Sequence, residues 1–219
     1  MLEFFDIGNT AATIAEYNMS WLELVSTVLA LGAVIAARKN SLWFYPLGIL
    51  NSVGFIALFH QIDLYSSALL NVYFIIISFY GWYIWTRKDG LGYEYPVRYM
   101  DGQLRMSAVL AIGFFTLLLW YFVDDVYGAL AGAFDVEYKR SAYAFLDSLT
   151  AVMSIFAMYT LAKRYVEAWV LWVLVDIICV YVYWAQGAKV LSVEYGIFLL
   201  NAIYGVYQWH KLSLQQHSS

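Results

Sequence analysis

Two tryptophans and an acidic residue share one face of an apolar stretch near the C-terminus. Trp169, Trp172 and Asp176 stand at positions i, i+3 and i+7, and Tyr183 follows at i+14, so all four lie on one side of a helix. The stretch contains no Lys or Arg, and an unpaired carboxylate in an apolar medium must be protonated, hydrated or close to a cation. Because indole faces also attract cations, the pattern predicts a site for a flat ligand that is cationic or forms hydrogen bonds.

Amide, hydroxyl and carboxyl side chains recur at similar depths in the other apolar stretches. Asn51 is central in residues 42–59, and Asn71 shares a face with Ser78 in residues 64–86. Glu194 and Asn201 align on one face of residues 188–209. The candidate binding residues are Asn51, Asn71, Ser78, Trp172, Asp176, Tyr183, Trp184, Glu194, Phe198 and Asn201. The alternative for each Asn is a hydrogen bond that only holds two membrane helices together.

Several further tryptophans stand near the ends of the apolar stretches. Trp43, Trp85, Trp120 and Trp209 have this position, and Trp169 shares it in part. Such positions are typical of the aromatic belt at a membrane surface, where the ring lies at the level of the lipid headgroups. We therefore expect at least part of this set to face the interface. A polar stripe in residues 142–162 (Tyr143, Asp147, Thr150 and Ser154) is a further candidate for the bundle interior.

The composition indicates a membrane protein. Of 219 residues, 63% are hydrophobic and only 13% charged, and the mean hydropathy is +0.65. This charged fraction is about half of that in a soluble domain, too small to cover a water-exposed surface. The net charge of -4 and the lack of a basic run exclude nucleic-acid binding as a main role.

The sequence contains no pattern typical of a metal site, a disulfide scaffold or a hydrolase. Cys179 is the one cysteine and lies within an apolar stretch. HExxH, GxSxG and paired GxGD-type motifs are absent, and Asp147 and Asp176 lie at different depths. We predict no metal, no cofactor and no enzyme activity; an intramembrane enzyme and a receptor that binds without transport are the alternatives from other classes.

Seven apolar stretches are long enough to cross a bilayer, whose core of about 30 Å takes roughly 20 helical residues. They cover about 21–37, 42–59, 64–86, 105–123, 142–162, 165–185 and 188–209. They do not alternate apolar and polar residues as the strands of a membrane barrel do. We therefore predict an all-α membrane protein with seven transmembrane helices.

The basic residues predict the orientation of these spans. Nine of the twelve Lys and Arg residues fall on the side opposite the N-terminus, and three fall on the N-terminal side. Because cytoplasmic loops are enriched in Lys and Arg, this places the N-terminus outside and the tail 211–219 in the cytoplasm. Residues 1–20 are acidic without a basic residue, which is unlike a secretory signal, and predict a short extracytoplasmic surface segment.

The first and last parts of the chain resemble each other. YGWYIWTRK (80–88) ends the third stretch and YGVYQWHK (204–211) ends the seventh, and similar pairs recur at separations near 124 to 126 residues. We predict a three-helix repeat at 21–86 and again at 142–210. The connector 87–141 contains a lipid-facing helix, 105–123, which gives both repeats the same orientation in a 3+1+3 arrangement. Parallel repeats are typical of transporters, with the substrate site where the repeats meet.

These motifs also carry a family resemblance. WxxWxxxD (169–176), LYSSALLNVYFIIISFYGWYIW (64–85), KRYVEAW (163–169) and SVEYGIF (192–198) resemble the PnuC-type vitamin transporters over roughly residues 20–211. The resemblance implies a bacterial inner-membrane protein with a 3+1+3 fold similar to the SWEET sugar transporters. It implies facilitated diffusion of nicotinamide riboside into the cytoplasm, where a kinase phosphorylates and traps it. A homo-oligomer is compatible with this interpretation.

The expected substrate fits the candidate residues. Trp172, Tyr183 or Trp184 would stack on the charged pyridine ring, and Asp176 or Glu194 would offset its charge. Asn51, Asn71 and Asn201 would bind the amide and ribose hydroxyls. Relatives also carry thiamine, riboflavin or deoxynucleosides, and many have Gln where this chain has Asn71. Thiamine, which is likewise a flat aromatic cation, is therefore the alternative substrate.

The repeats suggest a mechanism in which 21–86 rocks against 142–210 around one central site. Gly48, Gly54, Gly196 and Gly205 are small enough to permit close helix approach. Pro46 is either a hinge or a proline tolerated in the first turns of its helix. We find no convincing ion-coupling motif, although a proton role for Asp147 or Glu194 stays an alternative.

Overall fold

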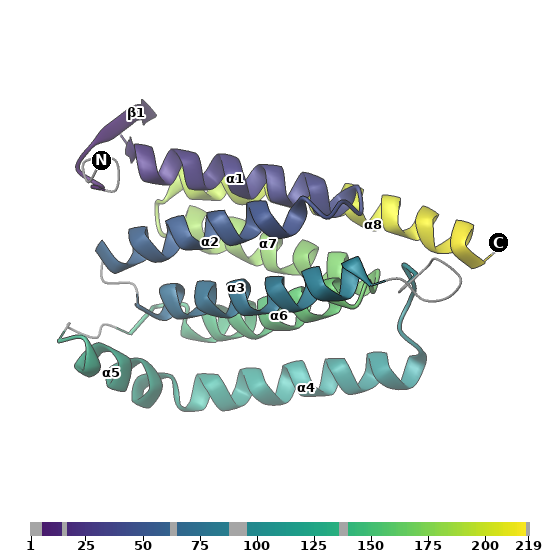
Figure 1. Ribbon diagram of the computed structural model, residues 1–219. Helices are drawn as coiled ribbons and strands as arrows, with labels where there is room; N and C mark the ends of the chain where they lie inside the picture. The colour runs from purple at the N-terminus through teal and green to yellow at the C-terminus, as the bar shows by residue number, and fades with distance from the viewer. Residues whose placement is uncertain (1–5, 15–16, 62–64, 88–95, 136–139, 218–219) are drawn as a thin grey trace.

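The computed structural model describes residues 6–14, 17–61, 65–87, 96–135 and 140–217, and within them the chain is almost entirely helical. The long helices run side by side in alternating directions (Figure 1). The helices are α1 (Trp21–Arg38), α2 (Phe44–Gln61), α3 (Tyr65–Thr86), α4 (Gly102–Tyr121), α5 (Val123–Ala133), α6 (Ala144–Ala162), α7 (Glu167–Ala185) and α8 (Lys189–His217). All-helical architecture is therefore confirmed.

Six of these helices are long and apolar enough to cross a membrane: α1, α3, α4, α6, α7 and α8. The helix α2 is not among them, because Asn51, His60 and Gln61 reduce its hydropathy although it has 18 residues. The predicted count of seven spans is thus not confirmed. The bounds of the long helices otherwise agree closely with the predicted stretches.

Three elements differ from the prediction. α8 has 29 residues, so at 1.5 Å per residue it is about 43 Å long and extends well into the segment predicted as a tail. The predicted connector 87–141 contains, after the helix predicted at 105–123, the short helix α5, which has Asp124 and Asp125 in its first turn, where acidic residues are favoured. Before α1, β1 (Thr10–Ile14) pairs with β2 (Tyr17–Ser20) in an antiparallel hairpin.

The helices form two triplets that contact each other through α3 with α6 and α1 with α8. Within the triplets, α2 packs between α1 and α3, and α7 packs between α6 and α8. α4 lies along the edge, against α6 (Figure 1). It buries only Thr116, while Phe114, Leu110 and Leu117 are more than half exposed, as expected for a helix that faces lipid.

At the end of the bundle where α1, α3 and α6 end, contacts occur in pairs. The corresponding residues of each pair are 124 positions apart in the sequence. The indole N–H of Trp85 on α3 donates to the carbonyl of Ala162 at the end of α6 (3.1 Å). The indole N–H of Trp209 on α8 donates to the carbonyls of Ala37 and Arg38 at the end of α1 (both 3.2 Å). Each tryptophan thus donates to a carbonyl at the end of a helix of the other triplet, where the last carbonyls lack a full set of donors from their own helix.

The turns after α1 and α6 have the same backbone structure. Asn40 has φ 53° and Arg164 has φ 60°, and the N–H of each donates to the carbonyl three residues earlier at 2.9 Å. Gly81 and Gly205 form another pair, against the rings of Tyr45 and Trp169 respectively, with no room for a Cβ at either position. Equivalent residues therefore make equivalent contacts in the two triplets.

Candidate functional site

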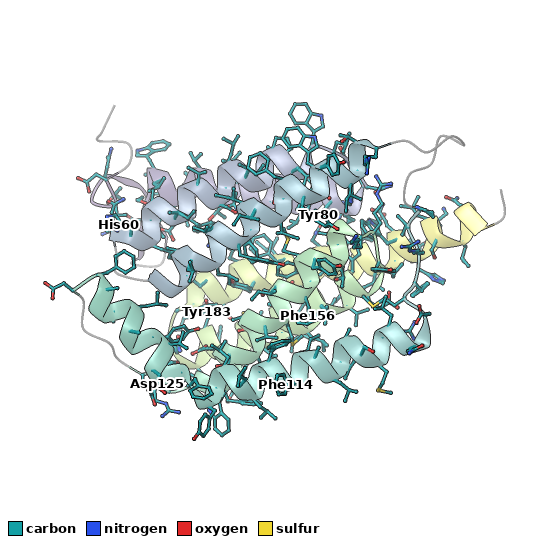
Figure 2. All side chains as sticks on the ribbon, turned by 60° about the horizontal axis from the view of Figure 1, so that its bottom comes forward. His60, Tyr80, Phe114, Asp125, Phe156 and Tyr183 are labelled. Carbon is teal, nitrogen blue, oxygen red and sulfur yellow. The ribbon has the colours of Figure 1, made fainter. Side chains whose placement is uncertain are left out.

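A cavity of about 400 Å³ lies inside the bundle. Residues of α1, α2, α3, α7 and α8 form its wall, and α6 adds Met158 and Leu161. Nine of the ten predicted binding residues line it: Asn51, Asn71, Ser78, Trp172, Asp176, Tyr183, Glu194, Phe198 and Asn201. Figure 2 shows the labelled Tyr183 between the helices, with His60 and Asp125 at one end of the bundle and Tyr80 towards the other. The helices thus bring together side chains that are up to 150 residues apart (51 and 201).

The cavity is acidic. Asp176 is 4% exposed and has neither an ion pair nor a hydrogen bond to any described residue. Glu194 and Glu23 line the same cavity, and no Lys, Arg or His is among the described residues that line it. Because carboxylates in a poorly solvated space create a strong negative potential, a cation would be stabilised here.

Several polar atoms in the wall have unused hydrogen-bonding capacity. The side-chain oxygens of Asn51 and Asn201 and the indole N–H of Trp169 are buried without a partner among the described residues. Buried polar atoms are normally satisfied, so a polar ligand or water would supply the missing partners. The amide N–H₂ of Asn201 donates to the carbonyl of Val34 on α1 (3.4 Å), so this residue also links two helices, as the alternative interpretation required.

Aromatic rings cover much of the remaining wall. Phe74 and Trp172 meet edge to face with centroids 6.5 Å apart. Tyr195 lies 5.2 Å from Tyr183 and 5.9 Å from Phe198, centroid to centroid. These rings offer faces on which a planar ligand can stack.

A layer of aromatic residues closes the cavity at the end of the bundle where α1, α3 and α6 end. Trp209 lies 5.7 Å from Trp169 and 6.0 Å from Trp85, and Tyr45 lies 5.1 Å from Trp85, between ring centroids. All four residues are at most 5% exposed. This layer separates the cavity from the side on which α8 ends.

Residues 96–101, here called the strap, lie against this layer. Val97 is fully buried in the core that contains Trp85 and Trp209. The backbone N–H of Arg98 donates to the carbonyl of Arg164 (3.1 Å), and the carbonyl of Arg98 accepts from the N–H of Val166 (3.0 Å). The strap therefore pairs with the turn between α6 and α7.

Glu167 and His210 hold the other end of the strap. The Glu167 carboxylate accepts from the backbone N–H of Met100 (3.1 Å) and forms an ion pair with Arg105 (2.9 Å). The hydroxyl of Tyr99 lies 2.8 Å from Nδ1 of His210 on α8. The strap is thus fixed to α7 and α8 at once.

Comparison with known proteins agrees with this arrangement. The model of the family described as "Nicotinamide mononucleotide transporter" matches residues 20–211. The chain belongs to this family. The nicotinamide riboside transporter PnuC of Escherichia coli (strain K12) is 31% identical over 225 residues, which cover 95% of this chain and 94% of that protein.

More distant relatives differ in the substrate that their names give. The nicotinamide riboside transporter PnuC of Neisseria mucosa is 26% identical over 91% of this chain and 75% of that protein. The riboflavin/roseoflavin transporter RibM of Streptomyces davaonensis is 25% identical over 93% and 91%. The crystal structure of the vitamin B3 transporter PnuC matches with a TM-score of 0.68 at 24% identity, over 89% of this chain and 83% of that one, and supports the fold.

One predicted binding residue does not lie in the cavity. Trp184 is 62% exposed and is absent from the wall. It directly follows Tyr183, and because successive side chains are rotated by 100° around the helix axis, it points away from the cavity. The expectation that Trp184 contributes to the site is therefore not supported by its position.

The structure also corrects the assignment of the tryptophans near the helix ends. Trp43 is 69% exposed and Trp120 42%, as expected at a membrane interface. Trp85, Trp169 and Trp209 are instead buried in the closing layer, because their N–H groups or ring faces meet a neighbouring helix. Sequence position alone does not distinguish the two environments.

Sequence reasoning missed the contribution of α1. Glu23 and Thr27 both line the cavity, and their spacing of i and i+4 places them on one helix face. That spacing indicates a polar face, but the remainder of the face consists of small residues such as Ala30, Ala33 and Ala37, which carry no polar signal. The predicted stripe of 142–162 contributes none of its four polar residues to the wall.

Proposed function

We propose that this protein transports nicotinamide riboside across the bacterial inner membrane. The observation that carries the proposal is the unpaired, buried Asp176 in a ring-lined cavity whose described wall has no basic residue. Nicotinamide riboside has a positively charged aromatic ring, an amide and ribose hydroxyls. The carboxylates offset its charge, the aromatic rings stack on its ring, and the unpartnered oxygens of Asn51 and Asn201 accept from its polar groups.

The phosphorylated form of the same compound fits this cavity poorly. A phosphate monoester carries a charge between about -1.5 and -2 at neutral pH and needs cationic partners. Glu23, Asp176 and Glu194 would repel it. The proposed substrate is therefore the riboside and not the mononucleotide, although the family description names the latter.

We propose that the chain spans the membrane seven times in the 3+1+3 arrangement, with repeats at 21–86 and 142–210 and the N-terminus outside. The contacts that recur 124 residues apart (85 and 209, 81 and 205, 40 and 164) support the repeats. The long helices α1, α2, α3, α4, α6, α7 and α8 run in alternating directions, which supports the odd number of spans (Figure 1). α2 is acceptable as a span because it packs between α1 and α3 and its Asn51 faces the cavity.

Transport requires that the closing layer and the strap open towards the cytoplasm. We propose that the two repeats rock against each other, which separates Trp85 from α6 and Trp209 from α1. The carrier mediates facilitated diffusion, and a cytoplasmic kinase traps the product by phosphorylation.

A binding titration of the purified protein tests the substrate. Nicotinamide riboside, its phosphorylated form, thiamine and riboflavin are compared by calorimetry. The riboside should bind best and the phosphorylated form least. Tighter binding of thiamine or riboflavin would refute the proposed substrate. Uptake into proteoliposomes with and without proton or sodium gradients then tests the mechanism, and gradient-driven accumulation would exclude facilitated diffusion.

A further inference from the structure

Gly48 lines the cavity at a position where the other triplet has a large ring. It stands 124 residues before Trp172 (48 and 172), in the register that relates Tyr45 to Trp169 and Gly81 to Gly205. Both Gly48 and Trp172 are in the cavity wall. Among the pairs that this register relates and that both line the cavity, Gly48 and Trp172 differ most in side-chain size.

Protein packing does not explain the absence of a side chain at Gly48. At Gly54, Gly81 and Gly205, a Cβ would collide with Ser26, Tyr45 and Trp169 respectively, so close helix packing requires glycine there. At Gly48 the nearest atoms to such a Cβ would be Cε2 of Phe44 at 3.9 Å and Oγ of Ser78 at 4.0 Å, which are ordinary contacts. Glycine within a helix is unfavourable relative to alanine, so its presence here needs another reason.

We propose that Gly48 determines the ligand specificity of the cavity, an inference that rests on the proposed function. The missing side chain leaves open the part of the cavity beside Ser78, where a planar ring of the ligand would fit. The position limits how broad a stacked ligand can be, so a side chain here acts on the ligand and not on the fold. A larger residue at position 48 therefore weakens binding most for the ligands with the broadest ring systems.

A series of substitutions at position 48 tests this inference in the full-length protein. Gly48→Ala fits without a clash, and Gly48→Leu extends further into the cavity. The matched control is Gly196→Ala on α8, where a Cβ would meet nothing within 4 Å and which is not in the cavity wall. Nicotinamide riboside, thiamine and riboflavin are titrated against each variant, and the thermal midpoint of each is recorded.

We expect the Kd for nicotinamide riboside to rise about tenfold in Gly48→Ala and binding to be lost in Gly48→Leu, a typical effect of overpacking a filled site. The thermal midpoints without ligand should not fall, and Gly196→Ala should bind as the wild type does. Wild-type affinity in Gly48→Ala and in Gly48→Leu would overturn the inference. So would equal losses in Gly196→Ala.

The design separates failure of the inference from failure of the proposed function. If the wild type binds thiamine or riboflavin in place of nicotinamide riboside, the proposed function is wrong, and the same series against that ligand decides the role of Gly48. If Gly48→Leu does not fold, Gly48→Ala and Gly48→Ser decide it. If the wild type binds none of the three, both proposals are overturned.

Discussion

Replacing Asp176 by Asn should weaken binding of a cationic ligand more than binding of a neutral one. The carboxylate is 4% exposed, has no cationic partner among the described residues and lines the cavity, so a bound cation would be its counterion. At a separation of about 4 Å and an effective dielectric constant of about 20, the attraction is roughly 4 kcal/mol. Desolvation of both charges offsets part of it, so we expect a net loss of about 1–3 kcal/mol, or roughly 5- to 150-fold in Kd.

The assay compares nicotinamide riboside with its reduced form, in which the ring is neutral and of almost the same size. Asp176→Asn should weaken binding of the cation and leave binding of the neutral ligand nearly unchanged. The protein without ligand should become no less stable, because the variant removes an unpaired buried carboxylate. Asp147→Asn, which alters a half-buried carboxylate outside the cavity wall, is the matched control.

Two results would refute this reasoning. An equal loss for both ligands would assign Asp176 a hydrogen-bonding or structural role. No loss for either ligand would show that the ring binds elsewhere or that the side chain is protonated, since Asn then resembles it in shape and charge.

Three further predictions concern the wall, the closing layer and the strap. Trp172→Ala and Asn201→Ala should each weaken binding about tenfold through lost stacking and a lost hydrogen bond; unchanged titrations for both would place the site elsewhere. Trp209→Phe should lower the free energy of unfolding by about 1–3 kcal/mol, because it removes the indole donor from the carbonyl of Arg38 and leaves that of Ala37 with backbone donors such as the N–H of Asn40; a melting curve like that of the wild type would contradict this. Glu167→Gln should loosen the strap, because it removes the ion pair with Arg105 and leaves a weaker, neutral acceptor for the N–H of Met100, and should speed labelling of a cysteine introduced at Val97, in a background without Cys179, roughly five- to tenfold. Asp124→Asn, which breaks the ion pair with Arg140, is its control, and equal rates in both variants would exclude Glu167 as the anchor.

The sequence predicted most of the polar side chains of the wall because two simple rules act together in a membrane. Hydropathy fixes the extent of each helix, and the cost of exposing polar groups to lipid fixes the face that turns inward. Asn51, Asn71, Asp176 and Asn201 all obey both rules and all line the cavity. Trp184 does not, because an aromatic ring is compatible with lipid and its inclusion did not rest on its helical face.

The rest of the site depends on contacts that no local pattern contains. Trp85 and Trp209 are buried because each finds a carbonyl on a helix from the other triplet, which only the packed fold supplies. Glu23 was overlooked because the helix around it is dominated by small apolar residues. Hydropathy does not predict the burial of the strap, because this burial follows from backbone pairing with the turn between α6 and α7.

The two triplets share several of the contacts that hold them together and differ at several positions that face the cavity. In the register of 124 residues, the packing pairs keep their type: Trp85 with Trp209 and Gly81 with Gly205. Several pairs in the cavity wall do not, since Gly48 corresponds to Trp172 (48 and 172) and Ser52 to Asp176 (52 and 176), whereas Phe74 and Phe198 keep the same residue type. Symmetric contacts give two halves that can move as equivalent bodies, whereas an asymmetric wall can recognise a ligand that itself has a charged ring on one side and a sugar on the other. It follows that substitutions at the second set should change which ligand is carried while the bundle and its closing layer stay intact.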